Sequence, residues 1–158
     1  MSVLLDAYRA ARRDEDAARL RRVIALRAMV ATGMTQREIA ESLGISQPAV
    51  SQQLSAHPLP GEVDPQTLLD AAAPVLKSLA ESHGFTRLAV FGSLARGQAR
   101  DDSDIDLLVE APPGTSSFGF VRFQQMLEQT LGREVDLAPY GGLTSKLDDD
   151  IRREAVPL

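Results

Sequence analysis

The chain has 158 residues, no cysteine, two histidines, an apolar content of 44% and a net charge of −5. The apolar content is sufficient for packed cores and indicates a globular chain, while the lack of cysteine excludes disulfides, thiolate zinc sites and cysteine nucleophiles. No apolar run approaches the roughly 20 residues that span a bilayer and the N-terminus lacks a signal-peptide core, so we expect a cytoplasmic protein.

The charge is distributed unevenly along the chain. Residues 1–57 carry eight arginines against six acids, a balance of +2, and residues 58–158 carry nine bases against sixteen acids, a balance of −7. Between these parts, the segment "HPLPGEVDP" holds three prolines and a glycine, which forbid a continuous helix. We therefore predict two domains with different partners, residues 1–57 and 66–158, joined by a linker at 58–65.

The first domain is predicted to be entirely helical. The apolar periodicity favours one short helix over residues 2–12 and a second over 14–31, ended by Gly33. Thr35 is a good N-cap with Glu38 three residues later, the spacing of a capping box, and predicts a helix up to Leu43. Ser46 is the N-cap of a further helix, in whose first turn Pro48 is tolerated.

Two short helices around a glycine-centred turn are typical of a helix-turn-helix, and "TQREIAESLGISQPAVSQQL" resembles that of bacterial transcriptional repressors. Gly44 suits the turn, and the expected shared core is Ile39, Leu43, Ile45, Val50 and Leu54. The alternative is a helical hairpin for dimerisation or another protein contact. On the DNA-binding interpretation, the contacts to bases and phosphates come from Thr35, Gln36, Ser46, Gln47, Ser51 and Gln52.

Helical and strand patterns alternate after the linker, which is typical of an α/β unit built on a small sheet. The predicted helices cover residues 65–82, 93–99, 118–131 and 144–155, and the predicted strands cover residues 88–91, 105–110 and 135–138.

Three aspartates stand where charge is costly, at or inside predicted strands. Residues i and i+2 of a strand project from one face, so Asp104 and Asp106 point together while Ile105 is buried opposite. Converging carboxylates share a proton or bind a divalent cation, and hard oxygen ligands favour Mg²⁺ or Mn²⁺. Asp136, a lone acid in a short apolar strand, is a candidate third ligand. The alternative is an acidic surface loop that runs into an ordinary strand.

A candidate phosphate-binding turn precedes these acids. Gly92 and Ser93 stand where a strand gives way to a helix, whose N-terminal N–H groups suit phosphate, and Arg96 offers bidentate contacts. Arg96 has a second interpretation, a surface ion pair with Asp101 or Asp102, two acids that we expect to be solvated loop residues. No Gly-Lys-Ser/Thr follows, so the turn is not a Walker P-loop.

The segments "GSLARGQARDDSDIDLLVE" and "VDLAPY" together resemble the nucleotidyltransferase superfamily that includes polymerase beta, and more narrowly the minimal nucleotidyltransferases. The resemblance covers residues 65–158, and the N-terminal helix-turn-helix departs from the minimal pattern. We expect an α+β protein overall, with the all-α helix-turn-helix domain followed by a small α/β domain whose short mixed sheet is flanked by helices. It also implies that Gly92 and Ser93 bind the triphosphate, that Asp104 and Asp106 hold two metal ions, and that Asp136 ligates the catalytic metal and helps to activate the attacking hydroxyl.

The same resemblance implies a function. Minimal nucleotidyltransferases resemble antitoxins that transfer AMP from ATP to a tyrosine of a HEPN-type ribonuclease toxin. The implied protein is thus an Mg²⁺- or Mn²⁺-dependent protein adenylyltransferase with a HEPN-type partner, a double-stranded DNA operator for autoregulation, and a homodimeric or hetero-oligomeric state. The alternatives are a transcriptional regulator whose nucleotidyltransferase fold senses nucleotide without transfer, and a small-molecule nucleotidyltransferase acting on drugs such as aminoglycosides.

Overall fold

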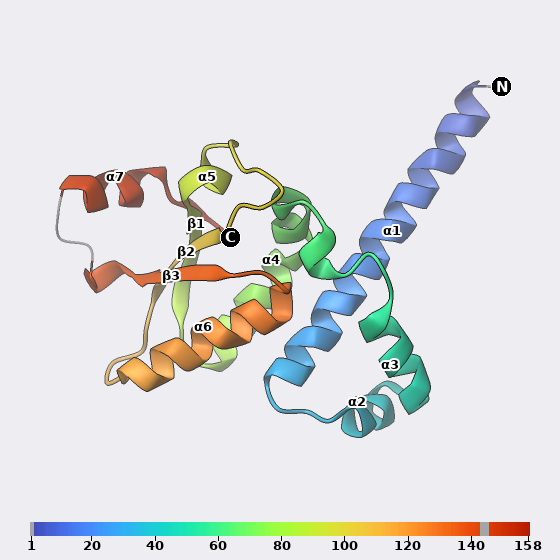
Figure 1. The fold of residues 1–158 in the computed structure, drawn as a ribbon, viewed down its shortest axis with the longest axis horizontal. Helices are drawn as coiled ribbons and strands as arrows, with labels where there is room; N and C mark the ends of the chain where they lie inside the picture. Colours follow the sequence, from blue (N-terminus) through green and yellow to red (C-terminus); the bar gives the residue numbers. More distant parts are fainter. Residues whose placement is uncertain (1, 143–145) are drawn as a thin grey trace.

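The computed structural model describes residues 2–142 and 146–158, which form three N-terminal helices followed by a small α/β unit (Figure 1). The N-terminal helices are α1 (Ser2–Ala31), α2 (Gln36–Leu43) and α3 (Gln47–Ser55). The α/β unit comprises η1 (Pro60–Glu62), α4 (Pro65–Ser82), β1 (Thr86–Phe91), α5 (Gly92–Ala95), β2 (Ile105–Glu110), α6 (Ser117–Leu131), β3 (Val135–Pro139), η2 (Tyr140–Gly142), α7 (Lys146–Glu154) and β4 (Val156–Pro157). The α+β fold class that the sequence predicts is confirmed.

Helix α1 is a single helix of 30 residues, so the prediction of separate helices over 2–12 and 14–31 is wrong. The physical reason is that no glycine or proline stands near residue 13, and nothing else there interrupts the ladder of backbone hydrogen bonds. None of the described helices is long and apolar enough to cross a membrane.

The turn between α2 and α3 has the predicted helix-turn-helix chemistry. Thr35 Oγ1 accepts a bond from the Glu38 amide at 3.1 Å, and the Thr35 amide donates to Glu38 Oε2 at 3.2 Å, which completes the capping box. Gly44 ends α2 in the left-handed conformation, at φ 69°, and Ser46 caps α3 by accepting a bond from the Ala49 amide.

The core of this helical part comprises Leu26, Ile39, Ala40 and Val50, with Leu54 partly buried. Ile39, Val50 and Leu54 were expected there. The prediction is wrong for Leu43 and Ile45, whose side chains remain 48% and 38% exposed. They flank Gly44, where the chain reverses direction, and their side chains therefore lie outside the helix crossing.

The sheet is mixed, with strand order β3-β2-β1-β4. Strand β1 is antiparallel to both β2 and β4, whereas β2 and β3 are parallel. Strand β4, which has two residues, was missed because so short a strand carries no periodic signal. Helix α5 is a single turn, shorter than the helix expected over 93–99, and the expected helix start at Thr144 lies outside the described residues.

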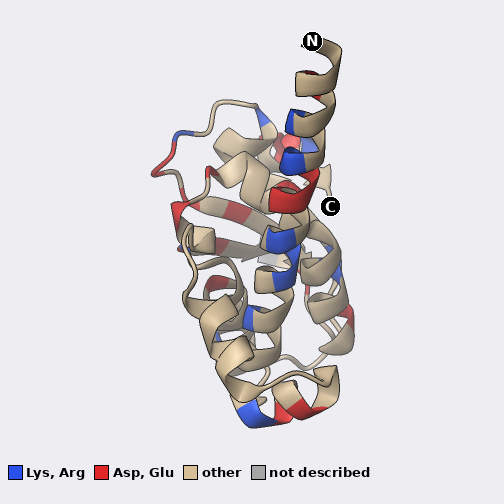
Figure 2. Ribbon diagram, turned by 90° about the vertical axis from the view of Figure 1, so that its right-hand side faces the viewer, with Lys and Arg blue, Asp and Glu red and all other residues tan. Residues whose placement is uncertain are grey.

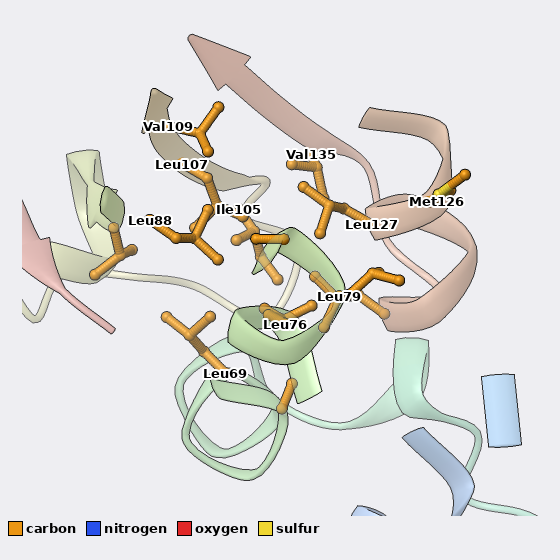
Figure 3. Packing of buried hydrophobic residues seen from close by; sticks show 14 of the residues in the cluster. Leu69, Leu76, Leu79, Leu88, Ile105, Leu107, Val109, Met126, Leu127 and Val135 are labelled. Carbon is orange, nitrogen blue, oxygen red and sulfur yellow. The ribbon is translucent and has the colours of Figure 1, made fainter. Parts of the chain in front are cut away.

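The main core lies between one face of the sheet and helices α4 and α6 (Figure 3). Strand β2 contributes Ile105, Leu107 and Val109 to this core, while Leu108 joins a smaller cluster on the opposite face that includes Ile151 of α7. Successive residues of β2 therefore point to opposite faces of the sheet, and Asp106, two residues before Leu108, points to the same face as Leu108. Asp106 thus projects from the face away from α4 and α6.

The proline-rich linker packs against the α/β unit. Pro60 and Pro65 are buried, and Gly61 lies so close to the carbonyl of Gly132, just after α6, that a Cβ at Gly61 would collide with that oxygen. Helix α1 also packs on this unit, since Ile24 belongs to the main core and Arg27 donates to the Gln129 carbonyl at 2.9 Å. The division at 58–65 stays a prediction, and α1 contacts the structures on both sides of it.

We predict that Gly61→Ala lowers the free energy of unfolding by about 1–3 kcal/mol, because the added methyl group meets a backbone carbonyl that no rotamer change moves aside. Urea denaturation measures the change. Gly141→Ala is the matched control, since a Cβ there has nothing within 4 Å. Equal stability of the two variants would contradict the close packing of the linker.

Candidate functional site

The candidate site is built on the parallel pair of strands β2 and β3. Their register places Asp106 directly opposite Asp136. Paired residues of adjacent strands project to the same side of a sheet, so the two carboxylates share one face. The structure therefore brings together two acids that stand thirty positions apart in the sequence, as expected from the lone acid in the third strand.

Asp106 is half-buried, and its carboxyl group is perturbed by its surroundings. Burial raises the pKa of Asp106 from 3.8 to about 6, and a hydrogen bond to Asp136 and the charges of Asp136 and Asp104 act in the same direction. The charge of Arg96 opposes this rise in the pKa of Asp106. In its protonated form, Asp106 donates the hydrogen bond to the Asp136 carboxylate.

Asp104 lies at the rim of this pair. It is exposed, one residue before β2 begins, and its charge is among the causes that raise the pKa of Asp106. Across residues 2–142 and 146–158, no three His, Cys, Asp or Glu side chains stand together as a group that could hold a metal ion. Two of the three predicted ligands are thus in contact, and the third is near enough to act through its charge.

The backbone of Gly92 lies directly against the carboxylate of Asp106. Strand β1 ends at Phe91, which pairs with Asp106 across the antiparallel ladder, and Gly92 follows with φ 71°. A Cβ on Gly92 would collide with Oδ2 of Asp106. Glycine is therefore required twice here, for the left-handed backbone and for the close approach of the carboxylate. Ser93, which follows in the single turn α5, lies beside the same carboxylate-bearing end of the sheet.

Arg96 forms an ion pair at 3.1 Å with Glu154 of α7, not with Asp101 or Asp102. Both side chains are half-exposed, so this pair contributes little to stability and leaves the guanidinium accessible. Its charge also acts on Asp106, which places Arg96 within electrostatic range of the carboxylates.

Two residues near the site were not found from the sequence. The first is Glu154, the partner of Arg96. The second is Arg133, whose guanidinium donates to the Ser103 carbonyl at 3.3 Å and to the Val63 carbonyl at 2.8 Å. Arg133 thereby ties the loop before Asp104 to the linker. Neither residue has a local sequence signal, because both contacts join segments far apart in the chain.

The arrangement fits a divalent cation. The facing donors are carboxylate oxygens, which Mg²⁺ and Mn²⁺ prefer, and a positive charge between Asp106 and Asp136 would offset both the burial and the neighbouring carboxylate charges that raise the pKa of Asp106. Asp106 and Asp136 would hold the ion.

The residues predicted to contact DNA lie along α2, α3 and the turn between them. Thr35, Ser46, Gln47 and Gln52 are exposed, and Gln36 and Ser51 are half-buried. The hydroxyls of Thr35 and Ser46 accept backbone bonds as N-caps, which leaves each O–H free to donate outward. The side chains of Gln47 and Gln52 lie on the solvent side of α3.

Both parts of the chain are similar to known protein families. Residues 74–157 match the family of nucleotidyltransferase domains, and residues 17–56 match region 4 of sigma-70 factors. A candidate protein adenylyltransferase of Methanocaldococcus jannaschii is 45% identical over 48% of this chain and 82% of its own length. The protein adenylyltransferase MntA of Thermococcus cleftensis is 39% identical over 51% of this chain and 81% of its own length. A solved structure of a candidate minimal nucleotidyltransferase superposes with a TM-score of 0.55 and 42% identity, over 61% of this chain and 97% of that one.

We predict that Asp106→Asn stabilises the metal-free protein at pH 7.5. Between pH 3.8 and about 6, the carboxyl remains protonated in the folded chain but ionises in the unfolded chain, so the free energy of unfolding falls as the pH rises. The raised pKa of Asp106 corresponds to a loss of roughly 3 kcal/mol in the free energy of unfolding. Solvent screening of this half-exposed group reduces the loss to about 1 kcal/mol, or about 2–4 °C in Tm.

Thermal unfolding in EDTA at pH 4 and at pH 7.5 checks this prediction. The gain should appear at pH 7.5 and vanish at pH 4, and Asp101→Asn, which neutralises an exposed loop carboxylate, should show no gain. A lower Tm for Asp106→Asn at pH 7.5 would show that the carboxylate pair is not repulsive.

Proposed function

Because the chain belongs to the family of nucleotidyltransferase domains, and is a nucleotidyltransferase, we propose that it transfers AMP from ATP to a hydroxyl group of a partner protein in an Mg²⁺-dependent reaction. The observation that carries the proposal is the register of β2 and β3, which sets Asp106 opposite Asp136. The relatives support the protein acceptor, since they are named protein adenylyltransferases.

The proposed reaction is an in-line displacement at the α-phosphorus of ATP. The acceptor oxygen forms a bond to that phosphorus, the bond to the bridging oxygen breaks, and pyrophosphate leaves. Asp136, which is exposed and at the edge of the pair, accepts the proton of the acceptor hydroxyl. Asp104, Asp106 and Asp136 would hold the divalent ions, which would supply positive charge to offset that of the phosphates.

The turn after β1 is the proposed triphosphate site. The backbone N–H groups of the turn would bind a phosphate, and the Ser93 hydroxyl adds a donor. Arg96 is placed to pair with phosphate oxygens by exchanging its surface contact with Glu154 for a charge-assisted one.

The proposed acceptor is a tyrosine hydroxyl of a HEPN-type toxin. The support is the chain's resemblance to antitoxins that adenylylate such toxins, while the names of its relatives support only a protein acceptor. In this proposal the chain is an antitoxin with a second activity, because its helix-turn-helix binds an operator and represses the genes of the pair.

We predict that Asp104→Asn, Asp106→Asn and Asp136→Asn each lower the transfer of label from α-³²P-ATP to the HEPN-type partner by about 100-fold or more, since each removes a carboxylate that holds the divalent ions. Asp101→Asn and Asp102→Asn, matched neutralisations in the exposed loop, should retain the transfer.

The label should also vanish with EDTA and return with Mg²⁺ or Mn²⁺. Label on the partner that survives Asp136→Asn would contradict the site. If ATP changed the affinity for the operator while no acceptor became labelled, the domain would be a nucleotide sensor and the transfer proposal would fail.

We predict further that Gln47→Ala and Gln52→Ala each weaken binding to a DNA fragment from upstream of the chain's own gene by about 5- to 100-fold, as expected for the loss of a base contact. Electrophoretic mobility shifts at fixed salt measure the affinity. Gln66→Ala on α4 is the matched control, since Gln66 is exposed and its side chain donates to Asp70 at 2.9 Å. Unchanged binding by both α3 variants would contradict the proposed DNA interface.

A further inference from the structure

The N-terminal half of α1 projects away from the rest of the protein (Figure 1). Four large apolar side chains on it are exposed: Val3 by 76%, Leu4 by 73%, Leu5 by 50% and Tyr8 by 70%. Within the part of the chain that the structure describes, Leu20 is the first α1 residue to pack against a hydrophobic cluster. A helical arm of this length is marginally stable when it contacts nothing, so a partner that covers it would stabilise it.

One stripe of α1 runs from this arm to the body of the protein. Leu5, Tyr8, Arg12, Asp16, Arg19 and Val23 follow one another at intervals of three or four residues, so they share one helix face. The order is apolar, aromatic, basic, acidic, basic, apolar. The apolar ends are therefore separated by a charged middle.

The C-terminal end of this stripe, near Val23, borders an apolar groove of about 480 Å³ between α1 and the linker. Ala17, Leu20 and Val23 line it from α1, and Pro58 and Val63 line it from the other side. Arg12 and Asp16 stand at the end of the groove that points toward the projecting arm. Arg19 is held at the groove by a 2.6 Å bond to the His57 carbonyl.

We propose that this groove receives the projecting arm of a second copy of the chain, in an antiparallel dimer whose two α1 helices cross near residue 14. In this register Leu5 of one copy lies over Val23 of the other, and Tyr8 lies over Leu20. By the two-fold symmetry both contacts occur twice, and the exposed arm of each copy is covered by the groove of its partner.

The charges of α1 specify this occupant and this direction. Basic and acidic segments alternate along the helix (Figure 2). In the antiparallel register Arg12 faces Asp16 of the other copy, and by the two-fold symmetry this contact occurs twice. The same register sets Arg9 opposite Arg19, whose guanidinium groups already have partners within each chain, Asp6 at 3.5 Å and the His57 carbonyl at 2.6 Å. A parallel pair would instead place Arg12 against Arg12 and Asp16 against Asp16, and like charges in contact oppose association.

The dimer has a consequence for the helix-turn-helix, because α1 packs directly against it through Leu26. Crossed α1 helices would relate two helix-turn-helix units by a two-fold axis, the arrangement that reads a palindromic pair of half-sites.

Charge exchange in the 158-residue chain tests the proposal by sedimentation equilibrium. Within one chain, Arg12 and Asp16 are exposed and 3.8 Å apart, so their variants should fold normally, as circular dichroism verifies. We expect wild-type dimers, and a dimer dissociation constant raised about tenfold or more in Arg12→Glu alone and in Asp16→Arg alone.

The decisive sample is an equimolar mixture of the Arg12→Glu and Asp16→Arg chains. In a mixed dimer, the acid introduced at position 12 of one chain faces the base introduced at position 16 of the other. The unchanged Asp16 of the first chain likewise faces the unchanged Arg12 of the second. Dimerisation should therefore recover, although the pair within each chain stays broken.

The matched control is Arg37→Glu, which breaks the corresponding pair with Glu41 on α2 and should dimerise like wild type. A monomeric wild type, or single variants that dimerise normally, would overturn the proposal and leave the arm to a different partner.

Cysteine pairing tests the direction independently, since the natural chain has no cysteine. Mixed Arg12→Cys and Asp16→Cys chains should form a disulfide with each other under mild oxidation. If Arg12→Cys instead crosslinked mainly to itself, the antiparallel crossing would be wrong.

Discussion

The parallel register between β2 and β3 is the constraint on which the site depends. It places Asp106 beside Asp136 and forces the two carboxylates to share one face of the sheet. The repulsion is tolerated because the neighbours of Asp106 in β2, Ile105 and Leu107, are fully buried on the opposite face and hold the strand in place. A shift of the strand by one residue would move those side chains out of the core, so hydrophobic burial fixes the register and the register fixes the carboxylates.

The features that follow from local chemistry were predictable from the sequence. The capping box at Thr35, the left-handed Gly44, the helix from Pro65 to Ser82 and the strand from Ile105 to Glu110 each have a signal within a few residues. Strand alternation also indicated the face of Asp106 and suggested that Asp136 on a neighbouring strand would meet it.

The remaining features depend on which distant segments meet. Glu154 pairs with Arg96, and Arg133 joins the linker to the loop before Asp104, although nothing near either residue in the sequence indicates its partner. The exposure of Leu43 and Ile45 similarly depends on the angle at which two helices cross, which apolar periodicity does not specify. The prediction separated two helices near position 13, where charged residues are frequent. In the structure the charged side chains do not interrupt the backbone hydrogen bonds, and α1 is one continuous helix.

Helix α1 connects the two proposed activities. Ile24 belongs to the core under the sheet and Leu26, two residues later, to the core of the helix-turn-helix. Residues two apart on a helix point in nearly opposite directions, so the same turn of α1 packs against both parts and fixes how they are oriented. The proposed DNA interface and the carboxylates therefore belong to one packed unit.

The central claim is that the β2–β3 register creates one metal–nucleotide site from Asp106 and Asp136. Electron paramagnetic resonance of Mn²⁺, titrated with a non-hydrolysable ATP analogue present, tests it most directly because it requires neither an acceptor nor turnover. We expect tight Mn²⁺ binding by the wild type and a comparable loss of affinity in Asp106→Asn and in Asp136→Asn. Unchanged Mn²⁺ affinity in Asp136→Asn would show that the two carboxylates do not bind the same ion.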